Sequence, residues 1–305
     1  DLMRKAVLIT NALLLLAAGT DYALDASRQF RGSAPGERLG GQTDRAAARS
    51  FDELRTRHIQ DHQSLFRRVA LTVGQTAPAV RALPTDQRLA AYAKGGDDPE
   101  LEALLFQYGR YLLMASSRRP GLPANLQGLW NDSNTPPWSS DYHVNINVQM
   151  NYWPAEPANL AECHLPLFDL IQSQLEPWRR ATQAEKEFQT AAGRVRGWAL
   201  RTSHNIFGGL GWQWDKTANA WYCQHLWEHY AFSGDPAYLA QTAYPILKEI
   251  CEFWEDQLKL LPDGRLVVPK GWSPEHGPHE DGVSYNQQIL HDLFSNYVLA
   301  ADALG

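Results

Sequence analysis

Segments with helical periodicity, separated by long aromatic and polar connections, most constrain the fold of this 305-residue chain. Their apolar residues recur at three- and four-residue spacing, the pattern of a helix with one buried face. We expect helices over residues 51–69, 101–117, 156–190, 217–233, 235–258 and 284–304. Connections rich in Trp, Gly, Pro and Asn fill residues 118–155, 193–216 and 261–283. Because long loops in a compact domain are usually functional, we expect the chemistry to lie in these connections.

Local signals mark where the first two helices begin. Ser50 opens a sequence typical of a capping box, and Asp98-Pro99 is a common helix start. Residues 27–50 are polar, rich in glycine and weakly periodic, so they predict a loop or linker. A second loop is expected around Pro78 and Pro84.

The composition excludes some functions and leaves others open. A net charge of -6 argues against nucleic acid or an anionic membrane as the main partner, since both favour a basic surface. Three cysteines without CxxC spacing indicate neither a disulfide framework nor a zinc cluster. Eleven Trp and twelve Tyr suit the stacking of sugar rings, but they also suit the filling of a large helical core.

The first 25 residues allow two interpretations. Basic residues after Met3 and the apolar run over 6–19 resemble a secretory signal. The same run is rich in β-formers and is interrupted at Asn11, which favours a pair of buried strands. The run is too short and too interrupted for a membrane span.

Residues 143–151 alternate between polar and apolar side chains. In an extended segment this alternation sends every second side chain to one face. That face would carry five neutral hydrogen-bonding groups: His143, Asn145, Asn147, Gln149 and Asn151. Such an array suits the hydroxyls of a sugar, although an edge strand with its polar face in solvent has the same pattern. Trp130, Trp138 and Trp153 lie nearby in the sequence and favour a ligand cleft.

Long ordered strings in these connections resemble one enzyme family. They are PANLQGLWN from residue 123, PPWSSDYHVNINVQMNYWPAEPANLAECHLPLF from 136, HNIFGG from 204, WQWDK from 212 and SPEHGP from 273. On these strings the chain resembles glycosyl hydrolase family 95, the α-L-fucosidases. The resemblance covers residues 50–305, and the first 25 more faintly.

The resemblance implies a mainly α fold that is part of an (α/α)6 barrel, preceded by the last strands of an N-terminal β-domain. On that basis we expect residues 1–30 to be terminal strands of a β-sandwich and not a signal peptide. Residues 31–95 would be a linker with a helix, and 96–305 the first part of an incomplete catalytic barrel. The chain would then be a truncated form of a longer protein.

The resemblance also implies an inverting mechanism, in which an acid protonates the glycosidic oxygen and a water attacks from the opposite face. By motif, Glu275 is the proton donor and Asn145 and Asn147 position the water. His143 corresponds to a ligand of the sugar and favours L-fucose over L-galactose. Further expected sugar-binding residues are Trp130, Trp138, His204, Trp214 and His276. In the family the general base is an Asp that lies further downstream, and no residue of this chain matches it.

Glu275 has a plain alternative interpretation, because a carboxylate beside Glu280 and Asp281 can simply be solvated. A general acid must keep its proton near neutral pH, which requires desolvation or a nearby negative charge. Trp272 and Pro274 could exclude water from this carboxyl.

Two other functions compete with this hypothesis. His225-Leu-Trp-Glu228-His229 matches the H-x-x-E-H pattern of a zinc peptidase, with both histidines on one helical face, although a third ligand is missing. A non-catalytic carbohydrate-binding protein would keep the aromatic cleft without the base. We expect no cofactor and no bound metal, a fucosylated oligosaccharide or glycan as partner, and no nucleic acid or membrane insertion. The chain itself does not indicate its compartment, whereas relatives suggest a secreted or periplasmic bacterial protein.

Overall fold

The computed structural model describes residues 13–191 and 193–305, which are mainly helical. Two compact units divide the chain, residues 1–67 and residues 68–305, and each is described by itself. The predicted N-terminal strands lie partly outside the described residues. Between residues 13 and 30 the described backbone forms a short 3-10 turn and one antiparallel bridge, which joins Tyr22 to Arg31.

The first unit contains α1 (Gly36–Ala47) and α2 (Phe51–Phe66). The capping box at Ser50 is confirmed, since its hydroxyl accepts from the Glu53 amide while the Glu53 carboxylate accepts from the Ser50 amide. The prediction of a loop over residues 27–50 is wrong for the part that forms α1. Its arginines, alanines, leucine and glutamine favour a helix, and they outweigh the two central glycines.

The second unit begins with three helices, α3 (Pro78–Arg81), α4 (Thr85–Tyr92) and α5 (Pro99–Ser116). The loop predicted here is also partly wrong. Pro78 stands at the first position of α3 and Pro84 directly precedes α4, positions where proline helps to start a helix because no amide hydrogen is needed there.

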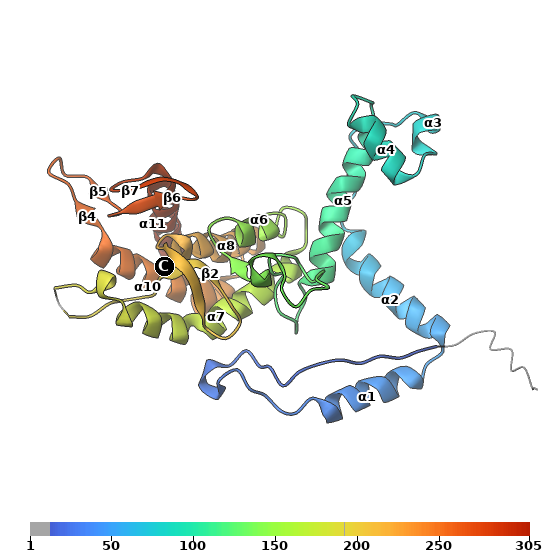
Figure 1. Ribbon diagram of the computed structural model, residues 1–305, viewed down its shortest axis with the longest axis horizontal. Coiled ribbons are helices and arrows are strands. Elements are labelled where there is room, and N and C mark those ends of the chain that lie inside the picture. Colours follow the sequence, from blue (N-terminus) through green and yellow to red (C-terminus); the bar gives the residue numbers. More distant parts are fainter. Residues whose placement is uncertain (1–12, 192) are drawn as a thin grey trace, which may run out of the picture. The chain divides into compact units, whose positions relative to one another are not determined.

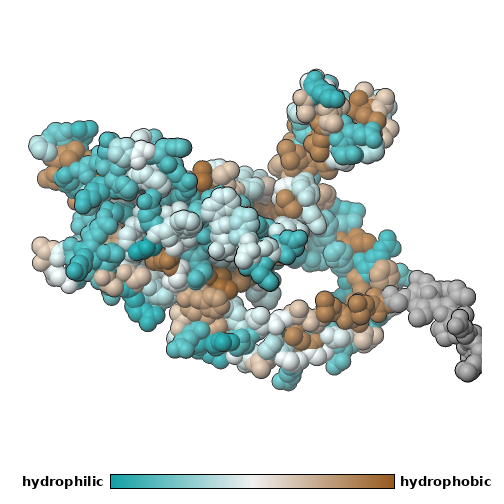
Figure 2. Space-filling view, in the orientation of Figure 1, coloured by the Kyte–Doolittle hydropathy of each residue, from teal (hydrophilic) through white to brown (hydrophobic). Residues whose placement is uncertain are grey.

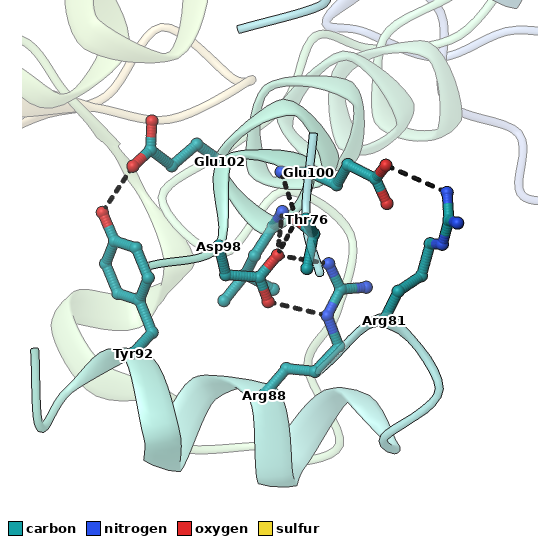
Figure 3. Close-up of polar contacts among 8 residues, drawn as sticks. Thr76, Arg81, Arg88, Tyr92, Asp98, Glu100 and Glu102 are labelled. Carbon is teal, nitrogen blue, oxygen red and sulfur yellow. Dashed lines mark hydrogen bonds and ion pairs between the residues drawn. The ribbon is translucent and has the colours of Figure 1, made fainter. Parts of the chain in front are cut away.

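Hydrogen bonds to Asp98 link α4 to the start of α5 (Figure 3). Its carboxylate accepts hydrogen bonds from Arg88 Nε at 2.8 Å and Nη2 at 2.7 Å, from Thr76 Oγ1 at 2.6 Å, and from the Leu101 amide at 3.1 Å. The bidentate geometry favours the ionised carboxylate. Arg88 is the main reason that the pKa of Asp98 lies well below its ordinary value.

This network predicts acid sensitivity of the second unit. A carboxyl whose pKa is lower in the folded than in the unfolded state stabilises the fold above its unfolded pKa of about 3.9, and the gain is lost as the pH falls. We expect Asp98→Asn to lower the urea midpoint at pH 7 and to flatten its decline below pH 4. The exposed neighbour Asp97 provides the control, and Asp97→Asn should keep the wild-type profile. If the urea midpoints of the two variants changed with pH in the same way, the assignment of the acid sensitivity to Asp98 would be contradicted.

The core of the second unit surrounds α8 (Ala218–Ser233). This helix is buried on most of its circumference and contacts α7 (Ala161–Ala184), α10 (Tyr244–Gln257) and α11 (Ser284–Leu304), which lie together in Figure 1. The short helix α9 (Pro236–Tyr238) and a π-helical segment (Leu239–Ala243) connect α8 to α10. Trp178, Trp198 and Trp254 are fully buried here, so part of the aromatic content fills the core. The predicted helices of this region are confirmed, with ends shifted by several residues in α7.

Three small antiparallel sheets occupy the connections between these helices. The first has the order β1 (Tyr142–His143), β2 (Leu200–His204), β3 (Leu210–Asp215). The others pair β4 (Lys259–Leu260) with β5 (Leu266–Val267) and β6 (Gly271–Ser273) with β7 (His276–Glu280). His143 lies opposite Ser203, and Ser203 lies opposite Gly211, so the long connections 118–155 and 193–216 meet in one sheet.

The prediction that residues 143–151 are extended is wrong beyond His143. The strand ends at His143, and Asn147–Tyr152 form the helix α6. Val148 and Tyr152 are both buried, and their four-residue spacing fits a helix as well as the alternation fits a strand. Gln149 donates to the Val144 carbonyl at 2.7 Å, so this side chain holds the backbone instead of facing a cleft.

The surface visible in Figure 2 is hydrophilic over much of the second unit, with hydrophobic residues gathered on α4 and α5. Leu89, Leu104 and Leu105 are among the exposed side chains of these helices. Among the described residues, no helix combines the length and apolar character that crossing a membrane requires.

Candidate active site

Glu275 and Asn145 meet although 130 positions separate them in the chain. Glu275 lies in the turn between β6 and β7, and Asn145 lies between β1 and α6. The Asn145 Nδ2 group donates a hydrogen bond to Glu275 Oε1 at 3.3 Å. The opposite end of the Asn145 amide, Oδ1, is buried and has no hydrogen-bond partner among the described residues. The amide thus presents an unused acceptor beside the carboxyl.

A cavity of about 420 Å³ opens beside Glu275. Its walls combine three aromatic rings with hydroxyl, amide and imidazole groups. The lining residues are Trp138, His143, Thr202, Trp212, Gln213, Trp272 and Glu275. The structure therefore brings Trp138 and His143 of one connection and Glu275 of another to one cavity. Glu275 itself is exposed to solvent.

His143 is oriented by Asp141, whose Oδ1 lies 2.8 Å from His143 Nδ1. An ionised carboxylate only accepts hydrogen bonds, so Nδ1 carries the hydrogen. In the neutral imidazole this leaves Nε2 as an acceptor. His143 can therefore accept a hydrogen bond from a ligand hydroxyl in the cavity.

The first turn of α11 anchors the strand that leads to Glu275. Asn286 Oδ1 accepts from the Trp272 amide at 3.1 Å, while Asn286 Nδ2 donates to Thr217 Oγ1 at 2.7 Å. A Cβ atom at Gly271 would lie 2.4 Å from Asn286 Oδ1, so a larger residue at that position would displace the Asn286 amide. These contacts fix β6 against the beginning of α8.

Tyr285 connects the same turn to Asn145. Its hydroxyl lies 3.3 Å from the Asn145 carbonyl oxygen and 3.4 Å from Asp215 Oδ2. Asp215 is buried, and desolvation raises its pKa to about 7. Asp215 does not line the cavity of Glu275, so its contact with Tyr285 gives it a structural role next to the site.

Comparisons with known proteins identify the family of the chain. The model of the glycosyl hydrolase family 95 catalytic domain matches residues 50–305. The chain belongs to glycosyl hydrolase family 95. It is 37% identical to "Probable alpha-fucosidase A" of Aspergillus niger over 310 residues, which cover 96% of this chain and 38% of that protein. It is also 37% identical to "Alpha-L-fucosidase 2" of Arabidopsis thaliana, over 84% of this chain and 32% of that protein. The chain thus spans about a third of the length of these curated relatives.

Four residues predicted to bind sugar do not line the Glu275 cavity of this family 95 chain. Trp130 borders a separate hollow with Met150. The Trp214 indole donates to Glu185 and packs edge-on against Phe188. His276, next to Glu275 in sequence, is exposed on β7.

His204, the last of the four, is a buried residue at the end of β2 in the first sheet. Its Nε2 lies 2.7 Å from the Tyr222 hydroxyl, and its ring stacks on Tyr142. Burial lowers the pKa of His204 to about 4. The imidazole is therefore neutral at physiological pH and belongs to the core beside a second, larger cavity.

The predicted water-positioning pair is only partly placed at the site. Asn145 contacts Glu275 without lining its cavity, whereas Asn147 opens α6 and does not line that cavity either. Trp212, by contrast, lines the cavity and was not selected from the sequence. The pattern Trp212-Gln213-Trp214 does not show which of the two rings faces the cavity. The pairing of β2 with β3 shifts in this part of the sheet, so the face of each residue does not follow from simple alternation.

The H-x-x-E-H helix forms a buried network with a different carboxylate. His225 and His229 share a face of α8, as predicted, but the carboxylate beside them is Glu156 and not Glu228. Glu156 Oε1 lies 2.9 Å from His164 Nδ1 and 2.6 Å from His229 Nδ1, and His164 Nε2 lies 3.0 Å from His225 Nδ1.

Hydrogen bonds alone account for this network. If each Nδ1 carries the hydrogen, His225 donates to His164, and both His164 and His229 donate to Glu156. Two ligands of one tetrahedral zinc ion, each about 2.0–2.1 Å from the metal, would stand roughly 3.3 Å apart. The observed contacts with Glu156 are shorter, so the geometry favours a hydrogen-bonded core over the peptidase hypothesis.

Proposed function

We propose that the protein carrying this chain is a glycoside hydrolase that removes terminal α-L-fucose, α-1,2-linked, with inversion of configuration. Family membership and the names of the relatives support the fucosidase activity. The observation that carries the residue assignment is the contact between Asn145 and Glu275. The helices of the second unit would form part of an (α/α)6 barrel around this site.

In this proposal the fucose occupies the cavity of Glu275. His143 Nε2 accepts a hydrogen bond from a sugar hydroxyl, and the Trp138 and Trp212 rings cover apolar faces of the ring. The sugar itself would cover the exposed Glu275 carboxyl and displace water from it.

The reaction then follows the inverting scheme. Glu275 donates its proton to the glycosidic oxygen as the bond from that oxygen to the anomeric carbon breaks. A water attacks the same carbon from the opposite face, held by the unpartnered Asn145 Oδ1 with help from Asn147. In inverting enzymes the carboxyl of the acid and the carboxyl of the base stand about 6.5–9.5 Å apart, which leaves room for the water. A carboxylate acting as general base removes the proton of this water, and we assign that role to none of the described residues.

The stereochemistry of the product tests this proposal. Proton NMR of the anomeric region, during hydrolysis of a fucosyl-α-1,2-galactoside by the full-length protein, should first show β-L-fucose, before mutarotation produces the α anomer. Initial α-L-fucose would contradict inversion. Binding of L-fucose without any release from the substrate would favour the non-catalytic alternative.

A further inference from the structure

Asp215 is a buried acidic residue that the proposed mechanism does not use. It ends β3, is 4% exposed, and does not line the cavity of Glu275. Its carboxylate accepts hydrogen bonds from the Tyr285 hydroxyl and from the hydroxyl and amide of Thr217. Burial outweighs these hydrogen bonds and raises the pKa of Asp215 to about 7. Both the protonated and the ionised carboxyl are therefore populated near neutral pH.

The Tyr285 hydroxyl stands between two acceptors. The Asn145 carbonyl oxygen lies 3.3 Å from it and Asp215 Oδ2 lies 3.4 Å from it, while Trp221 of α8 packs edge-on against the Tyr285 ring. Burial raises the pKa of Tyr285, so the hydroxyl keeps its hydrogen near neutral pH. A phenol has only one hydrogen to donate. Both contacts are longer than the usual hydroxyl hydrogen bond of about 2.5–3.0 Å, so neither acceptor holds this hydrogen fully.

The charge of Asp215 decides between the two acceptors. A hydrogen bond to an ionised carboxylate is about twice as strong as one between neutral groups, so ionised Asp215 attracts the Tyr285 hydrogen. A protonated carboxyl can instead donate to the Tyr285 oxygen, which leaves the Tyr285 hydrogen for the Asn145 carbonyl. Protonation of Asp215 therefore completes a chain of hydrogen bonds from Asp215 through Tyr285 to Asn145.

The other groups packed around Asp215 are apolar or already paired. Leu200 of β2 lies opposite Asp215 in the sheet. The adjacent Lys216 forms an ion pair with Glu187, with Nζ 2.5 Å from Oε1. Among the described residues, no charged side chain contributes to the pKa shift of Asp215, and Tyr285 is the titratable residue that contacts its carboxyl.

The main chain at Asn145 lies in a short link between two elements. The strand β1 ends at His143, and α6 begins at Asn147. The Asn145 side chain donates to Glu275 Oε1, and its own Oδ1 is buried without a partner among the described residues. A hydrogen bond from Tyr285 to the carbonyl of this link would fix where the amide stands relative to Glu275.

We propose that the proton of Asp215 controls the position of the Asn145 amide, with Tyr285 as the positioning residue between them. The amide is held beside Glu275 while Asp215 is protonated, and it loses this constraint when Asp215 ionises. The effect on turnover rests on the proposed function, because it makes Asn145 part of the site. The hydrogen-bond chain itself requires no substrate.

Turnover as a function of pH tests the proposal. The full-length protein is assayed on an aryl fucoside with an acidic phenol, because such a leaving group departs without the proton of Glu275. We expect the wild-type kcat to fall about threefold to tenfold as the pH rises through about 7, the effect of one hydrogen bond. Asp215→Asn cannot ionise and should lack this fall. Tyr285→Phe should also lack it and should keep the low wild-type value of high pH throughout.

Tyr297→Phe is the matched control, since it also removes a tyrosine hydroxyl from α11. This hydroxyl lies 3.3 Å from the Tyr244 hydroxyl and has no contact with Asn145. The variant should keep the wild-type pH profile. A wild-type kcat that does not fall near pH 7 would overturn the inference. So would a fall that persists in Tyr285→Phe, even if Asp215→Asn did not fold.

Crystal structures separate this inference from the proposed function, because they need no substrate. They are determined for the full-length wild type at about pH 5.5 and about pH 8.5, on either side of the pKa of Asp215. At the higher pH the Tyr285 hydroxyl should approach Asp215 and leave hydrogen-bond distance of the Asn145 carbonyl. Equal distances at both pH values would overturn the inference. If the distances change as expected but no fucoside is hydrolysed, the fucosidase proposal fails and the hydrogen-bond switch stands.

Discussion

Replacement of Glu275 by Gln is expected to lower kcat on a fucosylated oligosaccharide by about 10²–10⁴-fold, the usual contribution of a general acid. Gln keeps the size of the side chain and can still contact Asn145, but it has no proton to give to the leaving oxygen. The loss should shrink on an aryl fucoside with an acidic phenol, because such a leaving group departs without protonation. Steady-state kinetics on both substrates measures the difference.

Glu280→Gln is the matched control for this experiment. Glu280 lies on the same hairpin, at the end of β7, and is likewise exposed. Its replacement should leave kcat within about twofold of the wild type on both substrates, as is usual for exposed sites without special contacts. If Glu275→Gln retained activity on the oligosaccharide, or lost it equally on both substrates, Glu275 would not be the proton donor.

The second large effect is expected in stability. Glu156→Gln should lower the free energy of unfolding by about 3–5 kcal/mol, the cost of breaking a buried charged network by removing one partner. Burial would raise the pKa of Glu156, but hydrogen bonds from His164 and His229 outweigh it and lower the pKa to about 2. The ionised carboxylate thus stabilises the fold above about pH 4, and this contribution is lost as the pH falls towards 2. Urea unfolding at pH 7 and pH 3 measures both.

Glu228→Gln separates this network from the zinc peptidase hypothesis. Glu228 is the carboxylate of the H-x-x-E-H pattern, and desolvation raises its pKa. Replacing it by a neutral amide should therefore leave stability unchanged or slightly higher at pH 7. Metal analysis of the purified protein provides a second check. Stoichiometric zinc, together with strong destabilisation by Glu228→Gln, would reverse the assignment.

The long helices could be predicted from the sequence because their apolar spacing reports burial directly. The errors arose where one local signal has two meanings. Pro78 and Pro84 mark turns in one context and helix starts in another, and only the packing around Asp98 distinguishes them. The alternation over residues 143–151 likewise hid the four-residue spacing of Val148 and Tyr152, which the helical core selects.

The candidate site was partly accessible to sequence reasoning. Nothing in residue spacing brings Asn145 near Glu275, so the family motifs alone suggested that these residues meet. Motifs could not decide between Trp212 and Trp214, because the irregular pairing of β2 with β3 determines which ring faces the cavity. The Glu156 network was also missed, since its carboxylate lies outside the helix that carries the recognisable pattern.

The shared attachment of Asn145 and the β6 strand to Tyr285 and Asn286 has a consequence for how such a site can change. A substitution in the first turn of α11 would move Glu275, the proposed proton donor, and the Asn145 amide together, so the distance between the two groups would change little. The segment over residues 137–140 has no part in that attachment. The shape of the cavity can therefore be altered at Trp138 while the distance between Glu275 and Asn145 stays constant.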